Sequence, residues 1–142
     1  MTSFQRCARW LLVAVASLAP AMMAIRVSAE APAGRPAPKV IRLEAGDTGY
    51  QRILGGPPET VAMRSGLVVL GPGKAVGKHD TESYEEIVVV LEGQGQMRIT
   101  GGENLVIRAG HAAYCPPHTE HDVVNTGAGP LRYVYVVAKV EP

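Results

Sequence analysis

Residues 71–93 read GPGKAVGKHDTESYEEIVVVLEG, and this segment carries the features that decide the fold. Its turn residues separate His79, at the end of one predicted strand, from Glu86, at the beginning of the next. The run Ile87–Leu91 is apolar on both faces, which predicts a central strand of a sheet. The segment therefore indicates two strands joined by a polar turn.

The same alternation of short β-rich runs and Gly/Pro/Asn breaks continues on both sides of this segment, and no run of helical period is present from residue 40 onward. It predicts an all-β fold, a sandwich or small closed barrel. The predicted strands are Val40–Glu44, Tyr50–Leu54, Val61–Leu70, Glu85–Leu91, Gln96–Thr100, Asn104–Arg108, Ala112–Cys115, His121–Asn125 and Leu131–Val137.

The composition limits the classes of function. The chain has 142 residues, of which 46% are hydrophobic and 19% are charged, so it suits one small domain with a buried core. The formal net charge of +1 gives no support for nucleic acid as a partner. Neither a dinucleotide-binding nor a P-loop motif occurs.

The first 29 residues are typical of a secretory signal peptide. Arg6 and Arg9 precede an apolar run at 10–25, and the small residues before residue 30 predict cleavage after Ala29. The alternative is an uncleaved anchor, but the run is short for a membrane span. We therefore expect export to the periplasm or the outside of the cell, with no membrane span after cleavage.

The rest of the chain divides into two parts. Residues 30–39 form a Pro/Ala-rich, flexible tether, and residues 40–142 form the barrel domain. After cleavage Cys115 is the single cysteine, so no intrachain disulfide is expected, and its place at the end of an apolar strand predicts that the thiol is buried.

The histidines of the chain are clustered in its second half: His79, His111, His118 and His121. Histidines near carboxylates indicate a metal site, although the same residues also suit exposed loops. Because alternate residues of a strand share a face, Glu86 points the same way as Val88, and His121 the same way as Val123. If those faces point inward, His79, Glu86 and His121 converge, and a divalent cation would stabilise the buried carboxylate.

Two spacings resemble the motifs of the cupin family. Gly73-x5-His79-x-Thr81-x4-Glu86-x6-Gly93 resembles the first motif, and Pro116-x-His118-x2-His121-x3-Asn125 resembles the second. The resemblance implies a double-stranded β-helix, or jelly-roll barrel. It also implies a metal ion in the barrel mouth, held by His79, Glu86 and His121.

The chain departs from the family pattern at two positions. Thr81 stands where the first motif usually has a second histidine, and His118 stands at the glycine of the second motif. Two histidines and one carboxylate are the ligand set of non-haem Fe(II) oxygenases. Thr81 would then orient a metal-bound water, whereas His118 is an alternative fourth ligand and Glu85 replaces Glu86 if the strand parity is shifted by one.

A pocket beside this site is expected from the strand faces. Asp80, Glu82 and Glu120 are predicted to form an acidic rim that disfavours a strongly anionic substrate. The aliphatic face of the last strand is expected inside, with its tyrosine face on an outer or dimer surface, so a homodimer is predicted. The candidate lining residues are Val88, Val90, Met97, Ile99, Tyr114, Val123 and one of Tyr133 and Tyr135.

The leading functional hypothesis is a metal-dependent enzyme that acts on a small organic molecule, with a dioxygenase using Fe(II) as its most concrete form. Thr81 or Tyr114 would position substrate or water. A redox-neutral lyase or isomerase using Zn, Ni or Mn would have the same ligands. The second hypothesis is a non-catalytic cupin that binds a small ligand or a metal at a degenerate site.

Overall fold

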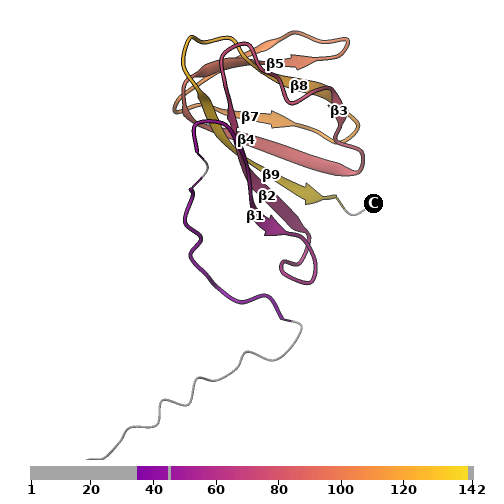
Figure 1. Ribbon diagram of the computed structural model, residues 1–142. Coiled ribbons are helices and arrows are strands. Elements are labelled where there is room, and N and C mark those ends of the chain that lie inside the picture. The colour runs from indigo at the N-terminus through magenta and orange to yellow at the C-terminus, as the bar shows by residue number, and fades with distance from the viewer. Residues whose placement is uncertain (1–34, 45, 141–142) are drawn as a thin grey trace, which may run out of the picture. The chain divides into compact units, whose positions relative to one another are not determined.

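The computed structural model describes residues 35–44 and 46–140, and Figure 1 shows this part as strands and loops without a helix. The predicted signal peptide at 1–29 and the first part of the predicted tether lie outside the described residues. Within them, no helix is long and apolar enough to cross a membrane. The described residues therefore form the all-β fold that the strand pattern predicts.

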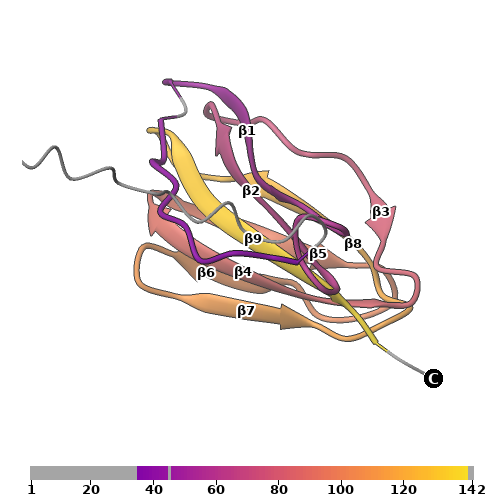
Figure 2. The same cartoon turned by 90° about the horizontal axis from the view of Figure 1, so that it is seen from below.

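Nine strands in the described residues form two antiparallel sheets. Their order in the first sheet is β1 (Gly49–Gly55), β2 (Met63–Leu70), β9 (Leu131–Lys139), β4 (Tyr84–Glu92) and β7 (Ala112–Cys115). Their order in the second is β3 (His79–Asp80), β8 (Glu120–Asn125), β5 (Gln94–Ile99) and β6 (Leu105–Arg108). The two sheets face each other in Figure 2, as in a jelly-roll barrel.

Most predicted strands are present, with ends shifted by at most two residues. The strand predicted at Val40–Glu44 is wrong. Its backbone bonds to a side chain in place of a partner strand, because the Gln51 amide donates to the Arg42 carbonyl and accepts from the Glu44 N–H. The strand predicted to end at His79 is present as the two-residue β3. No bounds were predicted for it, since its pattern is too short to show periodicity.

The core lies between the two sheets. β4 pairs with β9 on one edge and β7 on the other, so the prediction that Ile87–Leu91 is central is confirmed. The outward-facing side chains of this strand are nevertheless partly exposed, with Ile87 at 40% and Val89 at 36%. The buried core cluster consists of Val88, Val90, Met97, Ile107, Ala113, Cys115, Val123, Leu131 and Tyr133.

The orientation expected for β9 is wrong. Tyr133 is only 3% exposed, and it lies opposite Val68 on one neighbouring strand and Val90 on the other, so the tyrosine face points inward. The aliphatic residues Val134 and Val136 lie on the outer face instead. A tyrosine suits the inner face because the barrel encloses an open cavity, where its ring can pack while the hydroxyl remains near polar groups. The tyrosine face is therefore not available as the expected dimer surface, and the homodimer stays a prediction.

Candidate metal centre

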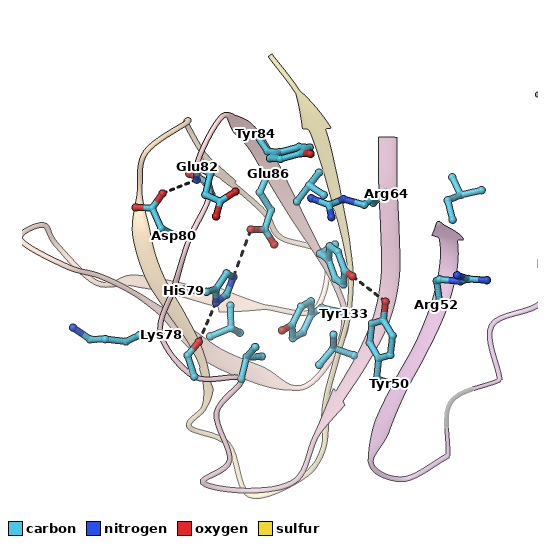
Figure 3. Close-up of a pocket in the computed structure, with 18 of the residues that line it drawn as sticks. Tyr50, Arg52, Arg64, Lys78, His79, Asp80, Glu82, Tyr84, Glu86 and Tyr133 are labelled. Carbon is cyan, nitrogen blue, oxygen red and sulfur yellow. Dashed lines mark hydrogen bonds and ion pairs between the residues drawn. The ribbon is translucent and has the colours of Figure 1, made fainter. Parts of the chain in front are cut away.

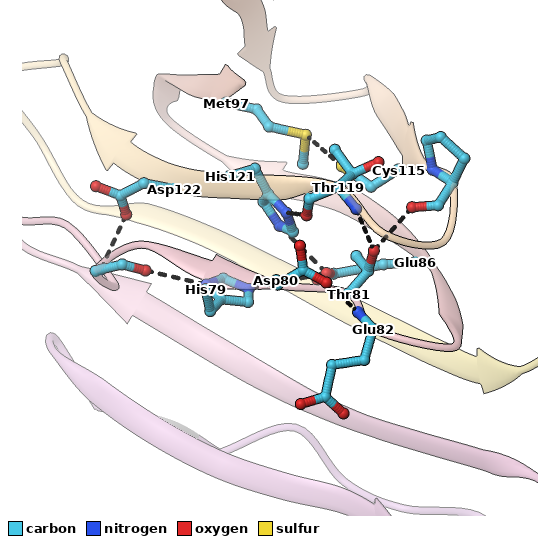
Figure 4. Close-up of polar contacts among 12 residues, drawn as sticks. His79, Asp80, Thr81, Glu82, Glu86, Met97, Cys115, Thr119, His121 and Asp122 are labelled. Atoms are coloured by element: carbon cyan, nitrogen blue, oxygen red, sulfur yellow. Dashed lines mark hydrogen bonds and ion pairs between the residues drawn. The ribbon is translucent and has the colours of Figure 1, made fainter. Parts of the chain in front are cut away.

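Three strands bring His79, Glu86 and His121 to one point between the sheets. β3 and β8 pair so that His79 lies directly opposite His121, and their ring centroids are 4.4 Å apart. Glu86 reaches the same point from β4, in the facing sheet. One ligand atom from each residue lies within 4.8 Å of the others. Figure 4 shows the three side chains pointing toward one another. The predicted trio is thus brought together by the meeting of the two sheets.

The carboxylate of Glu86 is the centre of this cluster. Its Oε2 lies 3.2 Å from Nε2 of His121 and 3.9 Å from Nε2 of His79. His121 is fully buried and Glu86 is 7% exposed, whereas the His79 side chain is 42% exposed. The cluster is therefore buried at His121 and Glu86 and open at His79.

Backbone carbonyls set the tautomer of both imidazoles. Nδ1 of His79 is 3.0 Å from the Gly77 carbonyl, and Nδ1 of His121 is 3.2 Å from the Thr119 carbonyl. A carbonyl oxygen can only accept a hydrogen bond, so each Nδ1 carries the proton. In the neutral rings, Nε2 then presents its lone pair to the Glu86 side of the cluster.

These donors fit a divalent cation. In the neutral ring, Nε2 of His121 is buried beside the Glu86 carboxylate and has no donor from which to accept a hydrogen bond, so only a proton or a metal ion satisfies it. A buried polar atom without a partner costs about 1–3 kcal/mol, which a coordinated ion would remove. Two imidazole nitrogens and one carboxylate oxygen suit Zn, Fe, Ni or Mn and leave positions open for water or a ligand.

In the metal-free protein, a proton occupies this cluster. Burial opposes protonation of His121, but its interactions with Cys115, Glu86 and the Thr119 carbonyl outweigh that effect and raise its pKa from 6.5 to about 10. A metal ion must displace this proton, so metal binding releases protons and strengthens as pH rises.

This pKa predicts opposite pH trends for the two forms of the protein. The protonated imidazole stabilises the metal-free fold fully below pH 6.5, and that contribution is lost as the pH rises towards 10, so the free energy of unfolding should fall across this interval. With saturating Zn²⁺, the metal-dependent stabilisation should instead grow. Urea unfolding at pH 6, 8 and 9.5, with EDTA or with Zn²⁺, measures both trends. His121→Gln should remove the fall, and a fall that persists in this variant contradicts the assignment.

Thr81 has a structural task at the edge of the cluster. Its hydroxyl donates to the Pro116 carbonyl at 2.8 Å and accepts from the Thr119 N–H at 2.9 Å. Figure 4 shows this hydroxyl between the β3–β4 turn and the loop before β8. It thereby holds together the two segments that carry His79 and His121.

Tyr114 lies elsewhere. The structure places it on the outer face of β7, 55% exposed, with its hydroxyl 3.2 Å from Glu85. Its expected place in the pocket lining is therefore wrong, because residues at odd and even positions of β7 point to opposite faces and Cys115 takes the inner one. Glu85 shares the outer face, so it is not in the cluster.

The remaining predicted residues also lie outside the cluster. His118 is exposed and has a φ of 57°, in the left-handed region. Glycine adopts this conformation easily, which explains why the second motif usually has glycine at this position. His111 accepts a hydrogen bond from Arg108. The Cys115 thiol is buried beside Met97, as predicted.

A cavity of about 740 Å³ opens beside the cluster (Figure 3). Of the predicted lining residues, Val123 and both Tyr133 and Tyr135 line it, whereas Val88, Val90 and Met97 belong to the packed core. Burial raises the pKa of Tyr133 and of Tyr135, and for Tyr135 a hydrogen bond with Tyr50 adds to the effect. Both phenols therefore stay protonated at neutral pH.

The expected acidic rim is incomplete. Asp80 and Glu82 line the cavity, but Glu120 does not and is paired with Lys78 instead. The opposite wall carries Arg52 and Arg64, which sequence reasoning missed. The alternation of β2, which places Arg64 on the face of Val68, was the available signal.

The sequence of the chain is similar to known proteins. The family model described as "Cupin domain" matches residues 66–137. An uncharacterized protein of Methanocaldococcus jannaschii is 34% identical over 71 residues, which are 50% of this chain and 54% of that protein. An oxalate-binding protein of Thermotoga maritima is 32% identical over 68 residues, 48% of this chain and 55% of that protein. The chain thus spans about half the length of both relatives.

A solved structure shows the same fold. A Cupin 2 conserved barrel domain protein from Salinispora arenicola superposes with a TM-score of 0.60 at 22% identity, over 73% of this chain and 91% of that one.

Proposed function

The chain belongs to the cupin domain family, and from this premise we propose that it is an exported protein that holds one divalent metal ion through His79, Glu86 and His121 and acts on a small organic molecule in the adjoining cavity. The observation that carries the metal assignment is the buried Nε2 of His121, which has only the Glu86 carboxylate beside it and is satisfied only by a proton or a metal ion. The apolar run at 10–25, followed by small residues, supports export.

Some residues around the cluster hold the two histidine ligands in place, and one side of the cluster stays open to a small molecule. Gly77 and Thr119 carbonyls orient the two imidazoles, and the Thr81 hydroxyl holds their segments together. The exposed side of His79 faces the cavity, so a small molecule can approach from there. A metal bound at such a site polarises oxygen groups of a substrate, or, if it is redox-active iron, supports reaction with O₂.

A dioxygenase is the reaction type that the ligand set favours, because two histidines and a carboxylate are typical of non-haem Fe(II) oxygenases. A redox-neutral lyase or isomerase would use the same three ligands with Zn, Ni or Mn. A non-catalytic binder is the second candidate, and the oxalate-binding relative from T. maritima favours it.

Loading the protein with different metals separates these functions. Protein collected from the exported fraction should contain about one first-row metal ion per chain, and its N-terminus should begin after Ala29. The Fe(II) form is then compared with the Zn²⁺ form for oxygen uptake, using a panel of catechols, thiols and oxalate.

Oxygen uptake by the Fe(II) form alone is expected of a dioxygenase. Substrate turnover by the Zn²⁺ form without oxygen uptake would instead identify a lyase or isomerase. Binding without turnover in either form identifies the binder, and purified protein that takes up no metal contradicts the whole proposal.

A further inference from the structure

We propose that the cavity takes a planar aromatic molecule with metal-binding oxygen atoms at one end and a carboxylate at the other, and that Arg64 binds the carboxylate. This inference rests on the proposed function, because the first end of the molecule lies at the metal cluster. It assigns a substrate class and a specificity residue to the cavity.

The register of the first sheet places Arg64 and the metal cluster in one row. Val137 of β9 lies opposite Arg64 of β2 on one side and opposite Glu86 of β4 on the other. All three line the cavity. Two strand spacings, about 9 to 10 Å, therefore separate the backbone positions of Arg64 and Glu86, with Val137 as the apolar floor between them.

The charges on the cavity walls are separated in the same direction. Figure 3 shows Asp80 and Glu82 on the side of His79, and Arg52 and Arg64 on the opposite side. A ligand with one anionic end is repelled by the acidic side and attracted to the arginine side. The separation therefore orients such a ligand, with its metal-binding end at His79 and its anionic end at β2.

Of the cations that line the cavity, Arg64 is the one that is free to receive an anion. Lys78 forms an ion pair with Glu120 at 3.2 Å, and Arg52 lies close to the Glu59 carboxylate, whose pKa it helps to lower. In the part of the chain that the structure describes, Arg64 forms no ion pair and instead lies over the Tyr84 ring, 4.5 Å from its centre. Stacking covers one face of the guanidinium and leaves its N–H edge available for a bidentate contact with a carboxylate.

Aromatic rings form the wall between the two ends. The rings of Tyr50 and Tyr135 are stacked with centroids 6.4 Å apart, and their hydroxyls are 3.0 Å apart. Gly66 makes this pair fit, because a Cβ there would lie 2.6 Å from the Tyr50 ring and 2.8 Å from the Tyr135 ring. With Tyr133 beside them, these rings suit a flat apolar ligand body.

The Arg64 side chain reaches the Tyr84 ring on β4, the strand that also carries Glu86. The two carboxylates of oxalate are joined by one C–C bond, so oxalate has no apolar body to lie against the tyrosine rings. An aromatic ring between a pair of hydroxyls and a carboxylate supplies that body and can lie over Val137, flat against the tyrosine wall.

Two probes that differ by one carboxylate test this assignment: catechol and 3,4-dihydroxybenzoate. Both are titrated by calorimetry into the Zn²⁺ form, in which no redox turnover occurs, and zinc content is measured separately. The wild type should bind 3,4-dihydroxybenzoate about tenfold or more tightly than catechol, the effect of one charge-assisted contact. Arg64→Met should reduce this ratio to near one without changing zinc content. Arg98→Met is the matched control, since Arg98 is exposed on β5 outside the cavity lining, and it should keep the ratio.

The outcomes separate the two proposals. Zinc uptake by the wild type with equal affinity for both probes, or a preference that survives in Arg64→Met, overturns the ligand class while leaving the metal site intact. Tighter binding of oxalate than of 3,4-dihydroxybenzoate also overturns it. A wild type that takes up no zinc overturns the proposed function, and this inference with it.

Discussion

Replacing His121 with alanine lowers the affinity of the protein for Zn²⁺ by more than about 100-fold, which is the upper range for losing only a supporting hydrogen bond around a metal. The physical reason is the position of the side chain. His121 is fully buried and its Nε2 lies 3.2 Å from Glu86, so the variant removes one of the three donor atoms of the cluster. Competition with a chromophoric chelator measures the affinity directly.

The other histidines supply matched controls for this experiment. His79→Ala should also lose affinity, whereas His111→Ala should keep it, because His111 interacts with Arg108 away from the cluster. His118→Asn should keep it as well, and asparagine tolerates the positive φ at that position. Unchanged zinc affinity in both His79→Ala and His121→Ala would refute the ligand assignment.

Replacing Gly93 with alanine should lower the free energy of unfolding by about 3 kcal/mol, through backbone strain combined with a steric clash. Gly93 connects β4 in one sheet to β5 in the other, with φ of 79°. A Cβ there would lie 2.1 Å from the carbonyl oxygen of Pro130, and backbone cannot move aside as a flexible side chain can. Urea unfolding in EDTA measures the loss without a contribution from metal.

Gly101 is the matched control for Gly93. Its φ of 75° is nearly the same, but nothing lies within 4 Å of the position that a Cβ would occupy. Gly101→Ala should therefore cost only the conformational strain, about 1 kcal/mol. Equal losses in the two variants would show that the contact with Pro130 does not contribute.

Alternation along the strands, together with the resemblance to the two family motifs, was sufficient to predict which three residues form the cluster. Alternation within a strand is a local rule, so Glu86 could be assigned to the face of Val88, and His121 to the face of Val123, without any knowledge of the partner strands. Gly93 was recognised from its place in the first of the two family motifs. The sequence alone therefore determined the all-β class, most of the strands and the three residues of the cluster.

The other wall of the cavity was decided only by the tertiary structure. Arg64 is far from Glu86 in the sequence, and the two meet in one row because both strands pair with β9 in a register that places Val137 between them. That register depends on long-range pairing, as does the inward orientation of Tyr133, because a single strand has two faces and its own pattern does not say which one the facing sheet will cover. Local periodicity can assign residues to a face, but only the packing of the two sheets decides which face is the inside.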